Sequence, residues 1–161
     1  MTIRYDGQVA IVTGSGNGLG RSHALALAAR GAKVLVNDLG GSVNGDGDSS
    51  DAAMETVAMI EAAGGEAIAN SANVANMDEV EAMMAQAVEK WGRVDILVNN
   101  AGILRDKSFA KMEMTDFQLV VDVHLMGSAN CSKAVWALMR EQGYGRIVMT
   151  TSSSGMYGNF G

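Results

Sequence analysis

The sequence predicts an α/β domain built on a doubly wound parallel sheet. Short apolar runs alternate with helical segments along the whole chain. The runs lack the polar alternation of a half-solvated sheet, so they are typical of strands covered on both faces. Strands that alternate with helices form parallel sheets with right-handed crossovers. We therefore expect five strands in one domain, residues 1–161: Val9–Thr13, Lys33–Asp38, Glu66–Ala69, Asp95–Asn99 and Arg146–Ser152.

The segments between the strands carry helical periodicity and helix end signals. Four helices are expected: Ser22–Arg30, Ala52–Ala63, Met77–Trp91 and Thr115–Glu141. Gly64 is a C-terminal stop for the second, while Asp78 and Glu79 favour the dipole at the start of the third. Thr115 is the expected N-cap of the fourth, which should end before Gly143. We expect the methionines of the third helix to fill the core, because they recur at helical spacing.

Composition excludes several classes of partner. The content is 48% hydrophobic and 19% charged, as in globular proteins. The net charge of −6 and the lack of clustered Lys and Arg argue against a nucleic-acid partner. No apolar stretch approaches the length of a membrane span, and the first residues run directly into a strand, which predicts no signal peptide.

The cysteine count and a polar loop bear on compartment and metals. The single cysteine, Cys131, cannot form an internal disulfide, so a reducing compartment such as the cytoplasm is expected. The loop at 40–48 contains two aspartates but lacks the glycine and the terminal glutamate that a calcium loop needs at fixed positions. No metal site is therefore predicted.

A glycine-rich turn separates the first strand from the first helix. It reads Thr13-Gly14-Ser15-Gly16-Asn17-Gly18-Leu19-Gly20. Phosphates bind backbone N–H groups at the positive end of a helix dipole, and glycine allows the close approach and the positive φ that this requires. A turn without a ligand is the alternative. The strand before it and the helix after it favour a Rossmann-type dinucleotide site, with six expected contacts: Gly14, Ser15, Asn17, Gly18, Leu19 and Gly20.

Asp38 predicts which dinucleotide binds. It lies 18 positions after Gly20, at the end of the second apolar run. There its carboxylate can accept hydrogen bonds from the adenosine ribose hydroxyls. A 2′-phosphate would meet a like charge, and two charges about 4 Å apart repel by roughly 4 kcal/mol at an effective dielectric near 20, before screening. NAD is therefore expected over NADP, unless Asp38 only caps a turn.

These motifs resemble those of the short-chain dehydrogenase/reductase family across essentially the whole chain. The family pattern is matched by Thr13-Gly14-x-x-x-Gly18-x-Gly20, by Asn99-Asn100-Ala101-Gly102 and by a serine-rich end to the fifth strand. Longer segments are similar to the (3R)-hydroxyacyl-CoA dehydrogenase unit of peroxisomal multifunctional enzymes and its bacterial relatives: Asn37–Gly41, Asn99–Phe109, Val123–Ser128 and Tyr144–Thr150. This resemblance makes a peroxisomal location the alternative to a cytoplasmic one.

The resemblance implies hydride transfer between a nicotinamide and a secondary alcohol or ketone, with a (3R)-3-hydroxyacyl-CoA as the expected substrate. Ser152 matches the family's catalytic serine, whose hydroxyl hydrogen-bonds the substrate oxygen. Asn100 would brace the sheet and the cofactor. Ala101 and Gly102 would line the nicotinamide ribose, and Val123 would pack beside the nicotinamide.

Two positions depart from the common pattern of the family. Asn73-Val74 stands where members usually have Asp-Val beside the adenine ring, and an amide can still donate and accept there. His124 stands where many members have an asparagine of the proton relay, although the hydroxyacyl-CoA subgroup resembles this chain in having histidine. A structural role for His124 is the alternative. The resemblance also implies a homo-oligomer.

The 161 residues contain no Tyr-x-x-x-Lys, the pair that supplies the general base in the resembling family. In the family this tyrosine follows the serine by about thirteen residues, whereas only nine follow Ser152 here. A tyrosine needs a nearby cation to act as a base at neutral pH. We therefore expect an incomplete dehydrogenase that is inactive in isolation. A non-catalytic dinucleotide-binding or structural module is the alternative.

Overall fold

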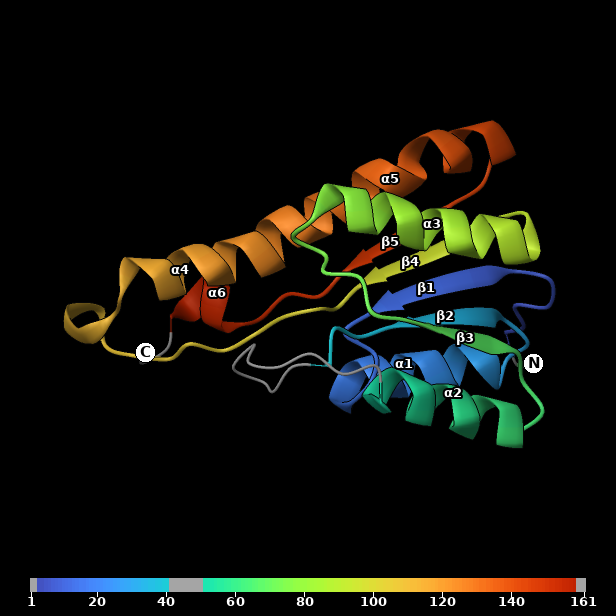
Figure 1. Ribbon diagram of the computed structural model, residues 1–161, viewed down its shortest axis with the longest axis horizontal. Coiled ribbons are helices and arrows are strands. Elements are labelled where there is room, and N and C mark those ends of the chain that lie inside the picture. Colours follow the sequence, from blue (N-terminus) through green and yellow to red (C-terminus); the bar gives the residue numbers. More distant parts are fainter. Residues whose placement is uncertain (1–2, 41–50, 159–161) are drawn as a thin grey trace.

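The computed structural model describes residues 3–40 and 51–158. It confirms the doubly wound α/β fold, with five parallel strands in the order β3-β2-β1-β4-β5 (Figure 1). The strands are β1 (Val9–Thr13), β2 (Lys33–Asn37), β3 (Ala67–Asn70), β4 (Ile96–Asn99) and β5 (Arg146–Met149). The predicted loop at 40–48 lies outside the described residues, apart from Gly40.

The burial of β1 explains its place at the centre of the sheet. All five residues of β1 are buried, and its neighbours are β2, with Val9 level with Lys33, and β4, with Ala10 level with Ile96. A strand covered on both faces has no polar side to turn to solvent, so it occupies the centre. β3 and β5 are the edge strands, and β5 is largely exposed.

Helices cover both faces of the sheet (Figure 1). On one face lie α1 (Gly18–Ala28) and α2 (Asp51–Ala62), whose buried alanines pack with Val12, Val34 and Val36. On the other lie α3 (Met77–Trp91) and α5 (Gly127–Gln142). Met83, Cys131 and Met139 pack there against the strand side chains that point to this second face of the sheet. The methionines of α3 thus include core residues, as predicted.

The predicted helix Thr115–Glu141 is confirmed as one unbroken helical run over residues 114–142, but its interior is not α-helical throughout. It divides into α4 (Met114–Val121), a π-helical turn η2 (Asp122–Met126) and α5. Thr115 is not the N-cap, because α4 begins one residue earlier and its cap position is Glu113. The i→i+5 turn inserts a residue into the ladder, which apolar periodicity alone does not reveal. The C-terminal signal is confirmed, since Gly143 has φ +66°.

Several element ends also differ from the prediction. α1 begins at Gly18, inside the glycine turn, rather than at Ser22. β5 ends at Met149, so Ser152 lies beyond the strand, in the turn before the short helix α6 (Ser154–Tyr157). Polar Thr150 still donates its backbone N–H to the Asn99 carbonyl, 2.9 Å away, which prolongs the pairing by one bond.

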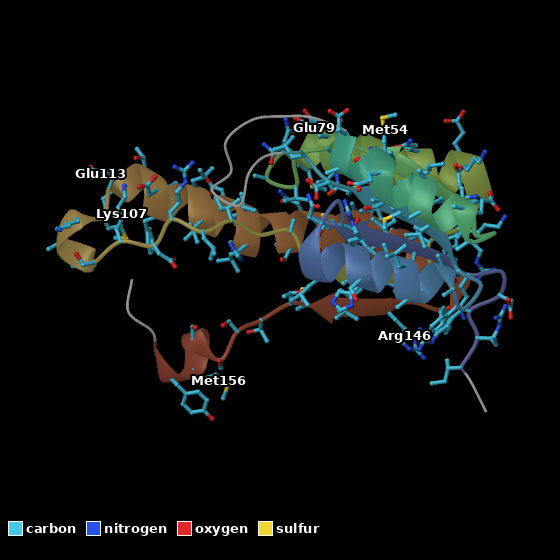
Figure 2. The ribbon with its side chains drawn as sticks, turned by 90° about the horizontal axis from the view of Figure 1, so that it is seen from below. Met54, Glu79, Lys107, Glu113, Arg146 and Met156 are labelled. Atoms are coloured by element: carbon cyan, nitrogen blue, oxygen red, sulfur yellow. The ribbon has the colours of Figure 1, made fainter. Side chains whose placement is uncertain are left out.

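A segment beyond the sheet forms an arm. It comprises residues 103–113, with the short 3-10 helix η1 (Phe109–Lys111), together with α4 and η2 (Figure 1). Figure 2 shows Lys107 and Glu113 on this arm, away from the sheet, and Met156 on α6. Lys107 Nζ lies 2.8 Å from Asp116 Oδ2, and this hydrogen bond holds the pKa of the Asp116 carboxyl below its usual range.

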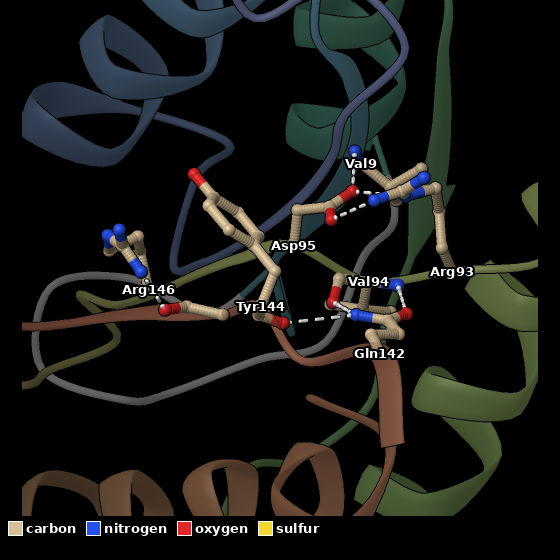
Figure 3. Close-up of polar contacts among 8 residues, drawn as sticks. Val9, Arg93, Val94, Asp95, Gln142, Tyr144 and Arg146 are labelled. Atoms are coloured by element: carbon tan, nitrogen blue, oxygen red, sulfur yellow. Dashed lines mark hydrogen bonds and ion pairs between the residues drawn. The ribbon is translucent and has the colours of Figure 1, made fainter. Parts of the chain in front are cut away.

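Asp95 anchors the amino ends of the sheet (Figure 3). Its fully buried carboxylate accepts from the Val9 backbone N–H at 2.9 Å and receives both arms of the Arg93 guanidinium, at 2.8 and 2.7 Å. Gln142 closes the same end by donating to the Val94 carbonyl at 2.8 Å. Hydrogen bonds to a charged acceptor in such a paired geometry are stronger than hydrogen bonds to a neutral acceptor.

Asp95→Ala should lower the free energy of unfolding by about 2 kcal/mol, because it leaves the buried Val9 N–H without an acceptor. Asp95→Asn should cost less, since an amide oxygen can still accept from Val9. Urea denaturation of both variants checks the ranking. Equal stability of Asp95→Ala and the unmutated chain would show that this anchor contributes nothing.

Candidate functional site

The candidate site is a pocket of about 580 Å³ at the carboxyl ends of the strands. The strand order reverses between β1 and β4, and open α/β sheets bind ligands in the crevice at such a switch point. Ten residues expected to bind a cofactor line it: Gly14, Asn17, Gly18, Asp38, Asn73, Val74, Asn100, Ala101, Gly102 and Val123. Six further lining residues were not predicted: Asn37, Leu39, Ala72, Ala75, Ile103 and Leu119.

The glycine turn is packed so tightly that three of its positions, Gly14, Gly16 and Gly20, leave no room for a side chain. Gly14 has φ +61°, and a Cβ there would lie 2.7 Å from the Ala101 Cα. A Cβ on Gly20 would overlap the Gly14 carbonyl oxygen and lie 2.6 Å from Asn100 Nδ2. Gly18 has φ +55° with open space around it. Close packing therefore fixes Gly14 and Gly20, whereas backbone conformation fixes Gly18.

Asn100 and Thr13 tie the turn to the end of β4. Asn100 Nδ2 donates to the Thr13 and Gly14 carbonyls at 3.0 and 2.9 Å. Thr13 Oγ1 accepts from the backbone N–H groups of Asn100 and Ala101, both at 3.0 Å. This network holds the main chain of both walls of the pocket in fixed positions.

Three predicted contacts stand outside the pocket lining: Ser15, Leu19 and Gly20. Ser15 is fully buried, and its hydroxyl donates to the Val12 carbonyl at 2.7 Å. The Leu19 side chain is 68% exposed. Gly20 is buried behind Gly14. Ser15 and Gly20 therefore shape the turn from behind the pocket wall.

Asp38 lies at the pocket with its carboxylate held by the main chain. Its Oδ2 accepts from the Gly16 N–H at 2.7 Å and its Oδ1 from the Gly40 N–H at 2.8 Å. Each carboxylate oxygen retains a lone pair for a further donor. The side chain is half-buried, so a ligand hydroxyl can reach it.

Asn73 and Val74 form the wall of the pocket after β3. Asn73 Oδ1 accepts from the Ala75 N–H at 2.9 Å, and its backbone N–H donates to Glu79 at 2.8 Å. Val74 is buried against Gly127, where a Cβ would lie 2.6 Å from a Val74 methyl. Both residues are thus fixed by the start of α3 and by α5.

His124 lies in the π-helical turn and contacts the loop after β4. Its Nε2 is 3.0 Å from the Ile103 nitrogen and 2.9 Å from the Ile103 oxygen, so the ring tautomer decides which backbone group it binds. A Cβ on Gly102 would lie 2.5 Å from the His124 ring. π-Helical turns are frequent at functional sites. This one places Val123 in the pocket lining, whereas His124 is not among the lining residues and contacts two of them, Gly102 and Ile103.

Ser152 is exposed in the turn after β5 and is not among the residues that line the pocket. Its Oγ accepts from the Ser154 N–H at 3.1 Å. The hydroxyl proton is left to donate elsewhere.

Other chemistry finds little support in the part of the chain that the structure describes. Burial raises the pKa of the Cys131 thiol to about 12, so it is a poor nucleophile. Residues 3–40 and 51–158 contain no cluster of three or more His, Cys, Asp or Glu that could hold a metal ion. None of the helices in these ranges is both long and apolar enough to cross a bilayer.

Fold and pocket together define a dinucleotide-binding α/β protein of the doubly wound class. The family of short chain dehydrogenases matches residues 8–161, and the chain belongs to this oxidoreductase family. It is 56% identical over 159 residues to the peroxisomal multifunctional enzyme type 2 of Drosophila melanogaster, covering 99% of this chain and 26% of that protein. The enzyme of the same name from Mus musculus is 51% identical over 162 residues, covering 99% and 21%.

A solved structure agrees with this assignment. The 7 alpha-hydroxysteroid dehydrogenase complexed with NADH and 7-oxo glycochenodeoxycholic acid superposes with a TM-score of 0.87 at 35% identity, covering 98% of this chain and 58% of that one. The chain thus spans about a quarter of the length of the two curated relatives and somewhat over half of the solved dehydrogenase.

Proposed function

We propose that this chain forms the cofactor-binding part of an NAD-dependent dehydrogenase that transfers hydride between the nicotinamide and a secondary alcohol or ketone. The observation that carries this proposal is the pocket at the strand switch point, with the glycine turn and Asp38 among its lining residues. Family membership and the NADH in a similar structure support a nicotinamide cofactor.

The pocket residues suit separate parts of such a cofactor. Gly14, Asn17 and Gly18 would approach the pyrophosphate with backbone N–H groups. Asp38 would accept from the adenosine ribose hydroxyls, while Asn73 and Val74 would contact the adenine. When bound, the nicotinamide supplies the hydride acceptor and donor.

The residues at the other end of the pocket would orient the reacting half. Asn100 braces the main chain there through Thr13 and Gly14. Ala101 and Gly102 would line the second ribose, and Val123 would pack against the nicotinamide. His124 would position the loop at Ile103 through its Nε2, and this contact supports a positioning role rather than proton transfer.

The substrate we propose is a (3R)-3-hydroxyacyl-CoA, and the location is peroxisomal or cytoplasmic. The peroxisomal names of the fly and mouse relatives and the segments Asn37–Gly41 and Val123–Ser128 support this choice. A reducing compartment also suits the buried free thiol of Cys131.

A non-catalytic dinucleotide-binding module is the second candidate, because the 161 residues include no Tyr-x-x-x-Lys. Intact-mass measurement of the natural protein separates the two. A mass well above 16.8 kDa favours the dehydrogenase, whereas a natural protein of this mass that binds NAD without turnover favours the module.

Asp38→Ala should narrow the preference for NAD over NADP. Removing the carboxylate abolishes its repulsion of a 2′-phosphate, so NADP affinity should rise by about tenfold after screening is allowed for. NAD affinity should fall, since the ribose hydroxyls lose an acceptor. Titration calorimetry with both cofactors measures the two effects. Asp38→Asn removes the charge but keeps an acceptor oxygen, so it separates the loss of repulsion from the loss of the acceptor. Equal affinities for NAD and NADP in the unmutated chain would show that Asp38 does not bind the ribose.

The chain should self-associate at micromolar concentration. Large apolar side chains on the arm and on α5 are exposed to solvent, and exposed apolar side chains of this kind mediate association when they gather in a patch. They are Phe109, Met114, Phe117, Leu125 and Trp136. Light scattering should therefore report a dimer or larger species, and the double substitution Leu125→Glu with Trp136→Glu should lower the mass. A monomer that binds no hydrophobic dye would contradict this expectation.

A further inference from the structure

Gly16 links Asp38 to a cluster of side chains on two helices. Gly16 is the central glycine of the turn and was not predicted as a cofactor contact. Its N–H donates to Asp38 Oδ2 at 2.7 Å. Its carbonyl accepts from Arg21 Nε at 2.7 Å. The Thr56 hydroxyl, which has one proton to donate, lies 3.1 Å from the same oxygen and 3.2 Å from the Ala52 carbonyl. Gly16 is therefore held at both ends by polar groups.

The cluster is built from α1 and α2. Arg21 is in the first turns of α1, and its side chain is only 19% exposed. Its Nη2 forms an ion pair with Glu55 Oε2 on α2 at 2.8 Å. Thr56, the next residue of α2, is fully buried. The guanidinium plane is thus fixed between the Gly16 carbonyl and a carboxylate, which suits the forked geometry of arginine.

Gly16 has no room for a side chain beside this cluster. A Cβ at this position would lie 2.7 Å from both the Ala52 Cβ and Asp38 Oδ2. The turn is therefore wedged between α2 and the Asp38 carboxylate. A displacement of Gly16 would be transmitted directly to Asp38, because the 2.7 Å hydrogen bond joins them.

We propose that Arg21 and Thr56 are positioning residues that set dinucleotide specificity through Gly16 and Asp38. The inference rests on the proposed NAD preference. Arg21 and Thr56 fix the Gly16 carbonyl, the Gly16 N–H fixes Asp38 Oδ2, and the carboxylate is held ready for two ribose hydroxyls. A preorganised acceptor binds its ligand more tightly than one that must first be ordered.

A second role for Arg21 is that of a nearby positive charge alone. The two roles predict changes of opposite sign in the NAD to NADP affinity ratio when Arg21 is replaced. A cation near the ribose attracts NADP more than NAD, because the 2′-phosphate adds negative charge. Its removal would then raise the NAD to NADP affinity ratio. Loss of a positioning residue lowers the ratio, because Asp38 no longer presents a fixed carboxylate.

The test uses the full chain and measures NAD and NADP affinities by titration calorimetry. Loss of a hydrogen bond is worth about 0.5–1.5 kcal/mol. Arg21→Met and Thr56→Val should therefore each lower the NAD to NADP affinity ratio by about two- to tenfold. Thr56→Ser keeps the hydroxyl, so its NAD to NADP affinity ratio should equal that of the unmutated chain. Arg30→Met is the matched control, since Arg30 Nη1 donates to the Ala26 carbonyl within its own helical segment, and it should leave the ratio unchanged.

A coupling measurement completes the test. In an Asp38→Ala background, Arg21→Met and Thr56→Val should no longer lower the ratio, since there is no carboxylate to position. A ratio that rises with Arg21→Met, or equal losses of NAD and NADP affinity, would overturn the proposal. Thermal melts show whether each variant is folded. If Thr56→Val is not, Thr56→Ala also removes the hydroxyl, and it should lower the ratio in the same way.

Failure of the proposed function has a different signature. An unmutated chain that binds neither cofactor, or binds both equally, overturns the NAD proposal and this inference with it. A chain in which Asp38→Ala lowers the ratio, while Arg21→Met and Thr56→Val do not, overturns the positioning role alone.

Discussion

Gly20→Ala should destabilise the fold by about 3 kcal/mol or more and lower NAD affinity by more than tenfold. The added methyl group would overlap the Gly14 carbonyl oxygen and press on Asn100 Nδ2. Both obstacles belong to the network that joins β1 to β4, so neither can move without breaking hydrogen bonds of 2.9 and 3.0 Å. Overpacking of this kind typically costs about 1–3 kcal/mol and more where backbone must shift. Thermal unfolding should show a midpoint lower by about 6–12 °C.

Two other glycines provide controls for this result. Gly155 in α6 has nothing within 4 Å of the position that an added methyl group would take and no positive φ, so Gly155→Ala should leave the midpoint unchanged or raise it slightly. Gly18 has open space but φ +55°, so Gly18→Ala should fall between the two, at about 1–2 kcal/mol. If all three variants melted together, close packing at Gly20 would not contribute to stability.

The positions of the strands could be predicted because each is an apolar run between turn signals. β1 and the start of β2 lie where they were expected, and the glycine turn between β1 and α1 identified the end of the sheet that holds the pocket. These features depend on local sequence, since hydrophobic runs and glycines act through their own backbone and burial. The parallel direction of the strands followed from the rules for βαβ connections.

The π-helical turn and the end of β5 could not be predicted in the same way. A five-residue segment such as η2 is too short for its apolar pattern to distinguish closure at i+4 from closure at i+5. The contact that His124 makes from this turn, to Ile103, spans 21 residues and has no local signal in the sequence. Similarly, Ser152 lies beyond β5 because backbone pairing with β4 continues only to Thr150.

Part of the pocket wall was also missed, although a signal was present. Asn37, Leu39 and Ala72 lie at or just after the carboxyl ends of β2 and β3. Parallel strands bring these ends to one edge, so the residues that follow each strand are candidates for the site. The link from Asp38 to Gly16 carries no such signal, since it depends on side-chain direction.

The second large expected effect is on catalysis, through the general base and through Ser152. We expect the 161-residue chain to produce no NADH above background from a (3R)-3-hydroxyacyl-CoA, and a chain extended through a Tyr-x-x-x-Lys segment to be active, because a positioned general base is worth about 10²–10⁴ in rate. In the extended chain, Ser152→Ala should lower the rate of hydride transfer by about 10²–10³, the typical cost of removing one donor to the reacting oxygen.

NAD affinity of Ser152→Ala should stay unchanged, because Ser152 is not among the residues that line the cofactor pocket. Ser153→Ala is the matched control: Ser153 is the neighbouring hydroxyl, forms no side-chain capping bond to α6, and should leave the rate unaltered. Absorbance of reduced nicotinamide gives the rate for every variant, and calorimetry gives the affinity. Robust turnover by the 161-residue chain would contradict the assignment of the general base to a Tyr-x-x-x-Lys pair. An equal loss of rate in Ser152→Ala and Ser153→Ala would contradict the assignment of the substrate hydrogen bond to Ser152. A fall in NAD affinity with Ser152→Ala would instead place the Ser152 hydroxyl on the cofactor. The hydroxyl proton is available for such a contact, because the hydrogen bond given for Ser152 Oγ within residues 51–158 is one that it accepts, from the Ser154 N–H at 3.1 Å.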